Sequence, residues 1–159
     1  MESEGIHRMA LLGVLATWCL YVVFALSTDW EDFGLTPTWP VDSMKYLVAR
    51  VSIATLWVVV AAVLLRLRLR SHPVNLRSFS YSFASAAVTC LAVSKYLVVE
   101  GANPVAIAGS VLFYALMSGF LSATVGKPRV AAVLGPLLVT VQLLADGFVH
   151  MFTGAFRFH

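Results

Sequence analysis

Charged residues are scarce in this chain of 159 residues: they make up 12% of it, whereas 60% of the residues are hydrophobic. Soluble globular domains carry about twice that share of charge, roughly 25%. The hydrophobic residues also occur in long windows without a polar stripe, which is typical of segments surrounded by lipid. The composition therefore excludes an ordinary soluble domain and predicts an integral membrane protein.

Cysteine and histidine are too few for thiol redox chemistry or a metal centre. The two cysteines, Cys19 and Cys90, lie in different apolar segments and form no C-x-x-C pair, so we interpret them as packing residues. Of the four histidines only His150 lies in an apolar segment, and one histidine cannot supply both axial ligands of a haem. No phosphate-binding loop or nucleophile elbow occurs. We expect no metal and no cofactor, and an enzyme is the least supported class of function.

Five apolar windows are each about 20 residues long, the length that crosses the hydrocarbon core as an α-helix. They cover, approximately, residues 9–27, 46–65, 79–99, 104–125 and 130–152. No long repeat, low-complexity tract or soluble domain interrupts them. The predicted fold class is therefore all-α: a single domain, residues 1–159, that forms a bundle of five transmembrane helices.

The loops alternate between basic and base-free segments, which predicts the orientation of the chain. The loop after the second window and the turn after the fourth are purely basic; their residues are Arg66, Arg68, Arg70, Arg77, Lys127 and Arg129. The loop from Thr28 to Met44 contains four acids and no base, and the remaining turn adds only Glu100. By the positive-inside rule, the N-terminus is cytoplasmic and the C-terminus lies outside. The basic loops then face anionic lipid headgroups, and we expect no nucleic-acid partner.

The first window admits a second interpretation. Arg8, the apolar run and Ala25-Leu26-Ser27 together resemble a secretory signal peptide with a small-residue cleavage site. The acidic residues Glu2 and Glu4 and a run of about 19 apolar residues favour a membrane anchor instead. We therefore expect this window to remain as a transmembrane helix.

Three ionisable residues lie inside the windows: Arg50 in the second, Lys95 in the third and Asp146 in the fifth. At a rise of about 1.5 Å per residue, all three fall in the outer part of the membrane. Such groups are costly in lipid, so they normally face the bundle interior and a partner. We predict that Asp146 pairs with Lys95, with Arg50 or with both.

The fifth window also carries a polar stripe, because Gln142, Asp146 and His150 recur at intervals of four and share one helix face. One interpretation is functional: an outward-opening polar pocket or a proton-coupled site. The other is structural: an ion pair and hydrogen bonds that fix the positions of the helices. The sequence leaves both open.

Small residues recur at intervals of four in the fourth window, where Ala115, Gly119 and Ala123 form a strip that lets a neighbouring helix come close. Two classes of function follow from the short loops, this strip and the intramembrane charges. The first is a non-enzymatic accessory or assembly subunit that packs against other membrane proteins or against itself. The second is a carrier or receptor for a small molecule or ion, as a homo-oligomer with an outward-facing polar site.

Overall fold

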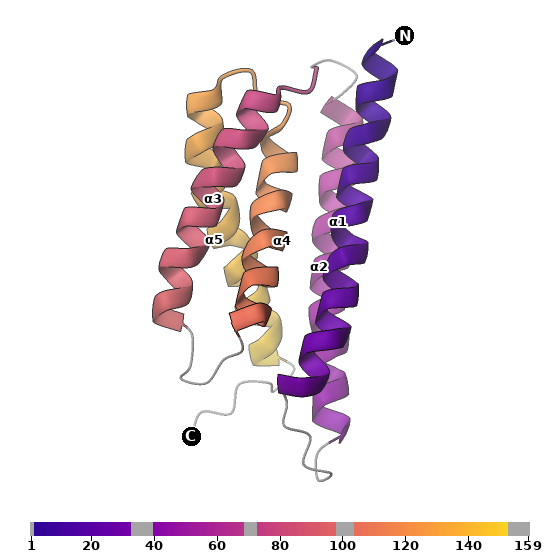
Figure 1. The fold of residues 1–159 in the computed structure, drawn as a ribbon, viewed down its shortest axis with the longest axis vertical. Helices are drawn as coiled ribbons and strands as arrows, with labels where there is room; N and C mark the ends of the chain where they lie inside the picture. The colour runs from indigo at the N-terminus through magenta and orange to yellow at the C-terminus, as the bar shows by residue number, and fades with distance from the viewer. Residues whose placement is uncertain (1, 33–39, 69–72, 98–103, 153–159) are drawn as a thin grey trace.

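The computed structural model of the protein describes four stretches of chain, residues 2–32, 40–68, 73–97 and 104–152. Their regular structure consists of five helices: α1 (Glu2–Asp32), α2 (Pro40–Arg68), α3 (Leu76–Leu97), α4 (Pro104–Ser122) and α5 (Pro128–Phe152). The described residues contain no strand, and the helices lie roughly side by side in one bundle (Figure 1). The all-helical architecture predicted from the sequence is confirmed.

Four of the helices are long and apolar enough to cross a membrane. The segments that meet this requirement are Arg8–Leu26 in α1, Val48–Arg68 in α2, Leu76–Val93 in α3 and Pro128–Ala145 in α5. The apolar part of α4 within the described residues, Ala108–Ser122, is shorter. A fifth crossing and the orientation of the two termini stay predictions.

The outer faces of the helices are covered with large aliphatic side chains. In α1, for example, Leu12, Leu20 and Val23 are 62%, 67% and 65% exposed. Contiguous apolar surface of this kind is unfavourable in water, at about 25 cal/mol per Å². In a bilayer the same surface contacts lipid chains, so these faces are compatible with an integral membrane protein.

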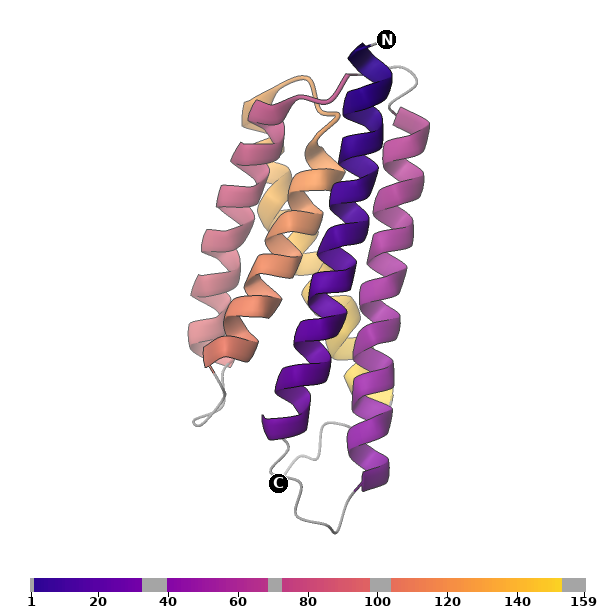
Figure 2. The same cartoon turned by 45° about the vertical axis from the view of Figure 1, so that its right-hand side comes forward.

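Helix α4 lies at the centre of the bundle, because it packs against each of the other four helices. Helix α3 lies on one side of it and α1 and α2 form a pair on the other, while α5 packs against α3 and crosses behind α4 to contact α2 as well (Figures 1 and 2). Among the described residues, α1 contacts only α2 and α4. The side chains of α4 are accordingly the most deeply buried: Phe113, Ala115 and Met117 are at most 2% exposed.

Helices α3 and α5 approach each other closely at a glycine. A Cβ atom added to Gly135 of α5 would lie 2.5 Å from the backbone carbonyl oxygen of Ser82 and 3.2 Å from the backbone nitrogen of Ala86, both in α3. Backbone atoms cannot move aside as a flexible side chain can. Any larger residue at position 135 would therefore separate the two helices.

Hydrogen bonds join the start of α3 to the turn after α4. The Asn75 side chain caps α3 by accepting from the backbone nitrogens of Arg77 and Ser78, at 3.1 and 3.3 Å. The backbone nitrogen of Asn75 donates to the carbonyl of Ala123 at 2.7 Å. Helix α4 ends at Ser122, before the end of the apolar window at residue 125, and the turn that follows it is held by these bonds.

Candidate functional site

Arg50 lies where α1, α2 and α4 meet, and its side chain is only 9% exposed. Its Nε donates to the hydroxyl of Tyr21 in α1 at 2.8 Å, and its Nη2 donates to the hydroxyl of Ser110 in α4 at 2.8 Å. The guanidinium carbon also lies 5.6 Å from the centre of the Tyr21 ring, within the range of a cation–π interaction. One side chain of α2 therefore joins three helices.

The energies explain why the guanidinium needs these contacts. A charged side chain near the centre of a bilayer costs about 2.5–3.5 kcal/mol even on a lenient scale. A hydrogen bond to a charged group contributes about 1.5–3 kcal/mol. The sequence predicts that Arg50 lies in the outer part of the membrane, where the penalty is smaller, and two such bonds, with Tyr21 and Ser110, are of the size needed to offset it.

Of the three predicted intramembrane charges, Arg50 is the one whose side chain the structure describes. Lys95 and Asp146 are in α3 and α5, but their side chains, and that of His150, lie outside the described part of the chain. The pairing of Asp146 with Lys95 or Arg50 therefore stays a prediction. The sequence did not single out Tyr21 as a neighbour of Arg50.

Gln142 belongs to a second polar cluster, between α3, α4 and α5. Its Nε2 donates to Ser118 Oγ at 3.3 Å, while Ser82 Oγ donates to the Ser118 carbonyl at 3.1 Å and lies 3.0 Å from Ser122 Oγ. All four side chains are 0% exposed, and Gln142 Oε1 has no hydrogen-bond partner within the described residues. Such hydroxyl and amide contacts hold membrane helices together.

The small residues of α4 face the interior of the same chain. Ala115 and Ala123 are 0% and 1% exposed. At Gly119 an added Cβ would lie 2.8 Å from the ring of Phe79, so this glycine makes room for a side chain of α3. The strip thus brings α3 and α4 together.

Helices α1 and α4 meet through two reciprocal contacts between a phenylalanine and a glycine. The ring of Phe24 in α1 lies against Gly109 in α4, where an added Cβ would overlap it. At the other end, the ring of Phe120 in α4 lies against Gly13 in α1, where an added Cβ would be 2.8 Å away. In each helix the two contact positions are 11 residues apart, which is about 16 Å along the axis. The two contacts therefore set the register of these antiparallel helices.

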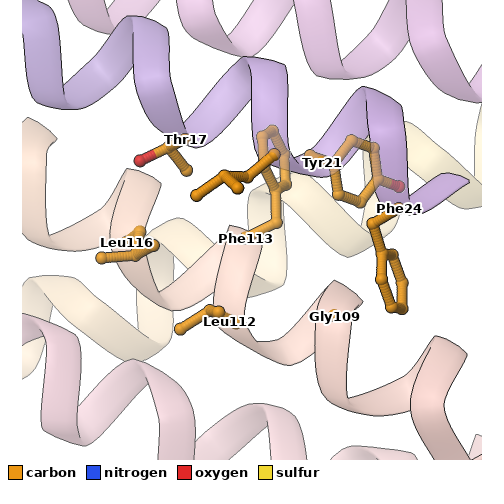
Figure 3. A pocket seen from close by; sticks show the side chains of 8 residues that line it. Thr17, Tyr21, Phe24, Gly109, Leu112, Phe113 and Leu116 are labelled. Carbon is orange, nitrogen blue, oxygen red and sulfur yellow. The ribbon is translucent and has the colours of Figure 1, made fainter.

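A pocket of about 220 Å³ lies between α1 and α4 in the interval that these two contacts define (Figure 3). It is lined by Thr17, Leu20, Tyr21, Phe24, Gly109, Leu112, Phe113 and Leu116. Leu20 and Leu112 are 67% and 50% exposed, so the pocket opens on the outer face of the bundle.

The lining of the pocket is apolar, because its two hydroxyl groups form hydrogen bonds within the protein. Thr17 Oγ1 donates to the carbonyl of Gly13 at 2.8 Å, and the Tyr21 hydroxyl accepts from Arg50. An apolar cavity of about 150 Å³ is enough to bind benzene. The pocket can therefore hold a small apolar group, and none of its lining residues is an acid, a base or an activated nucleophile.

The sequence alone did not predict this pocket, although the glycines at its two ends can be seen in the sequence. Gly13 and Gly109 lie inside apolar windows, where glycine permits the close approach of another group. Their partners, Phe120 and Phe24, lie 107 and 85 positions away in the chain. Only the folded arrangement shows which phenylalanine meets which glycine.

Metal and thiol chemistry find no support in the described residues. They contain no group of three or more His, Cys, Asp or Glu side chains that could hold a metal ion. Cys19 is exposed on α1 and Cys90 is buried in α3, and both are free thiols.

No protein-family model, curated protein or solved structure matches the chain.

Proposed function

We propose that this chain is a membrane protein that binds a small lipid-soluble molecule between α1 and α4, as a receptor or a carrier. The observation that carries the proposal is the pocket of about 220 Å³ between the Phe24–Gly109 and Phe120–Gly13 contacts. Small-molecule pockets usually measure about 300–1,000 Å³. This pocket accordingly suits a small ligand or one end of a larger one.

The lining selects a neutral, apolar ligand that enters from the bilayer. No charged side chain lines the pocket, and the exposed Leu20 and Leu112 lie at its edge on the outer face of the bundle. Lipid chains are as apolar as leucine, so hydrophobicity alone cannot favour the pocket over the bilayer. Affinity must come from close van der Waals contact with the pocket walls, above all the rings of Tyr21 and Phe113.

Saturable labelling by a photoreactive hydrocarbon, a small aromatic diazirine, tests this proposal on the purified protein in lipid vesicles. We expect Leu112→Trp to abolish saturable labelling, because the indole fills the pocket. The matched control is Leu56→Trp, since Leu56 of α2 is 59% exposed and does not line the pocket. Labelling that never saturates, or that both variants retain, would contradict a binding pocket.

The accessory or assembly role expected from the sequence needs a different surface from the one first considered. Ala115 and Ala123 are buried and Gly119 receives Phe79 of the same chain, so the small-residue strip is occupied inside the bundle. An assembly partner, or a second copy of the chain, would have to use the outer apolar faces. Purification in a mild detergent at native expression tests this role, which requires a partner chain in a fixed ratio.

A further inference from the structure

Tyr21 belongs both to the wall of the pocket and to the Arg50 cluster. Its ring packs on Phe113, another wall residue, with the ring centres 4.2 Å apart and 30° between the ring planes. Its hydroxyl accepts the hydrogen bond from Arg50 Nε, and its side chain is 5% exposed. The Tyr21 ring therefore forms part of the pocket wall, while its hydroxyl is held by the charged group of Arg50.

Arg50 is connected to both walls of the pocket without lining it. On the α1 side it holds the hydroxyl of Tyr21, and on the α4 side it holds the hydroxyl of Ser110. Ser110 directly follows Gly109, the residue that receives the ring of Phe24 at one end of the pocket. The guanidinium of α2 therefore links the two helices between which the pocket lies.

We propose that Arg50 is a positioning residue for ligand binding: it fixes Tyr21 and thereby the shape of the pocket, although it does not touch the ligand. This inference rests on the proposed function, since it specifies how the same pocket is held. Shape matters here because the pocket offers its ligand no polar contact and binds through van der Waals contact, which weakens steeply with distance. Releasing Tyr21 from Arg50 lets the ring leave Phe113 and lowers affinity.

Tyr21→Phe is the variant that tests this, because it removes the hydroxyl and keeps the ring. Losing one hydrogen bond to a charged group, of about 1.5–3 kcal/mol, corresponds to roughly a 10-fold or larger change in an equilibrium constant. We expect about a 10-fold loss in the apparent affinity of the aromatic diazirine. In the Tyr21→Phe background, Arg50→Gln should cause a smaller loss than it does in the wild type, because the two variants remove the same Tyr21–Arg50 hydrogen bond. If Arg50→Gln does not fold, Tyr21→Phe alone decides the test.

The matched control is Thr55→Val, which removes another hydrogen-bond acceptor between α1 and α2. Thr55 Oγ1 accepts from Trp18 Nε1 at 3.0 Å, and neither residue lines the pocket. We expect Thr55→Val to lower thermal stability and leave the affinity for the diazirine unchanged.

The possible results bear differently on this inference and on the proposed function. Saturable labelling of the wild type together with weaker binding by Tyr21→Phe alone supports both. Equal affinities for Tyr21→Phe and the wild type, or equal losses in Tyr21→Phe and Thr55→Val, overturn the positioning role and leave the pocket standing. Absence of saturable labelling in the wild type overturns the pocket, and the positioning role with it.

Discussion

Glycines that receive a phenylalanine ring occur in both halves of the bundle, since Gly119 of α4 receives Phe79 of α3, but backbone contact at a described glycine occurs in one half alone. In the half formed by α3, α4 and α5, Gly135 brings the α5 backbone against the backbone of α3 at Ser82. In the other half, Gly13 and Gly109 each receive a phenylalanine ring from the facing helix. Backbone contact closes an interface, whereas two separated ring contacts hold helices in register and leave space between them.

The polar residues follow the same division. Between α3, α4 and α5, the described polar cluster is neutral, 0% exposed and bonded across the helices, as Ser82 and Gln142 show. At the junction of α1, α2 and α4 the polar cluster contains the charge of Arg50 and adjoins the pocket through Tyr21. Under the proposed function, the first half is the scaffold and the second half contains the binding site.

The largest expected effect comes from Asp146, which the sequence predicts to pair with Lys95 of the same half, with Arg50 of the other half, or with both. If Asp146 of α5 pairs with Arg50 or Lys95, Asp146→Asn leaves an unpaired charge in the membrane and costs about 3–5 kcal/mol of stability. Adding Arg50→Met or Lys95→Met should restore part of the loss. Denaturant or thermal unfolding in detergent measures both effects. Unchanged stability of Asp146→Asn would show that no such pair exists.

A smaller loss is expected where the scaffold is tightest. Gly135→Ala places a methyl group against the carbonyl of Ser82, and overpacking of this kind costs about 1–3 kcal/mol. Gly5→Ala is the control, because an added Cβ at Gly5 in α1 meets nothing within 4 Å. It should stabilise the helix slightly, by about 0.5–1 kcal/mol. Equal unfolding temperatures for the two variants would contradict backbone contact between α3 and α5.

The smallest effect is expected at Gln142. Its one described hydrogen bond goes to Ser118, and a side-chain bond between membrane helices contributes about 0.6 kcal/mol on average. Gln142→Leu loses that bond but also removes the buried, unpartnered Oε1 atom. We expect a change in stability within about 1 kcal/mol of zero. A clearly larger loss in thermal unfolding would reveal a further partner of this amide.

The helices and the buried charge could be predicted from the sequence, because both follow from the cost of polar groups in lipid. Apolar windows of helical length gave the five helices, and the same cost predicted that Arg50 points inward. The partners of Arg50 could not be predicted, because Tyr21 and Ser110 are neutral residues 29 and 60 positions away. A hydroxyl carries no sequence signal that distinguishes a partner of a charge from a packing residue.

The pocket could not be predicted from the sequence, for a related reason. It arises from the spacing of two contacts between distant segments, and hydropathy treats Phe24 and Leu20 as equivalent. The small-residue strip at Ala115, Gly119 and Ala123 signalled close packing but did not say which helix would approach. The structure assigns that neighbour to α3, through Phe79 and Gly119.

Mapping the residues that a photoreactive hydrocarbon labels in vesicles shows whether a ligand binds between α1 and α4. We predict that saturable labelling by the aromatic diazirine, identified by mass spectrometry, concentrates on residues 17–24 of α1 and 109–116 of α4, with none at the interface around Ser82 and Gln142, whose side chains are 0% exposed. Saturable labelling at that interface, or labelling spread evenly over the outer leucines and valines, would contradict binding between α1 and α4.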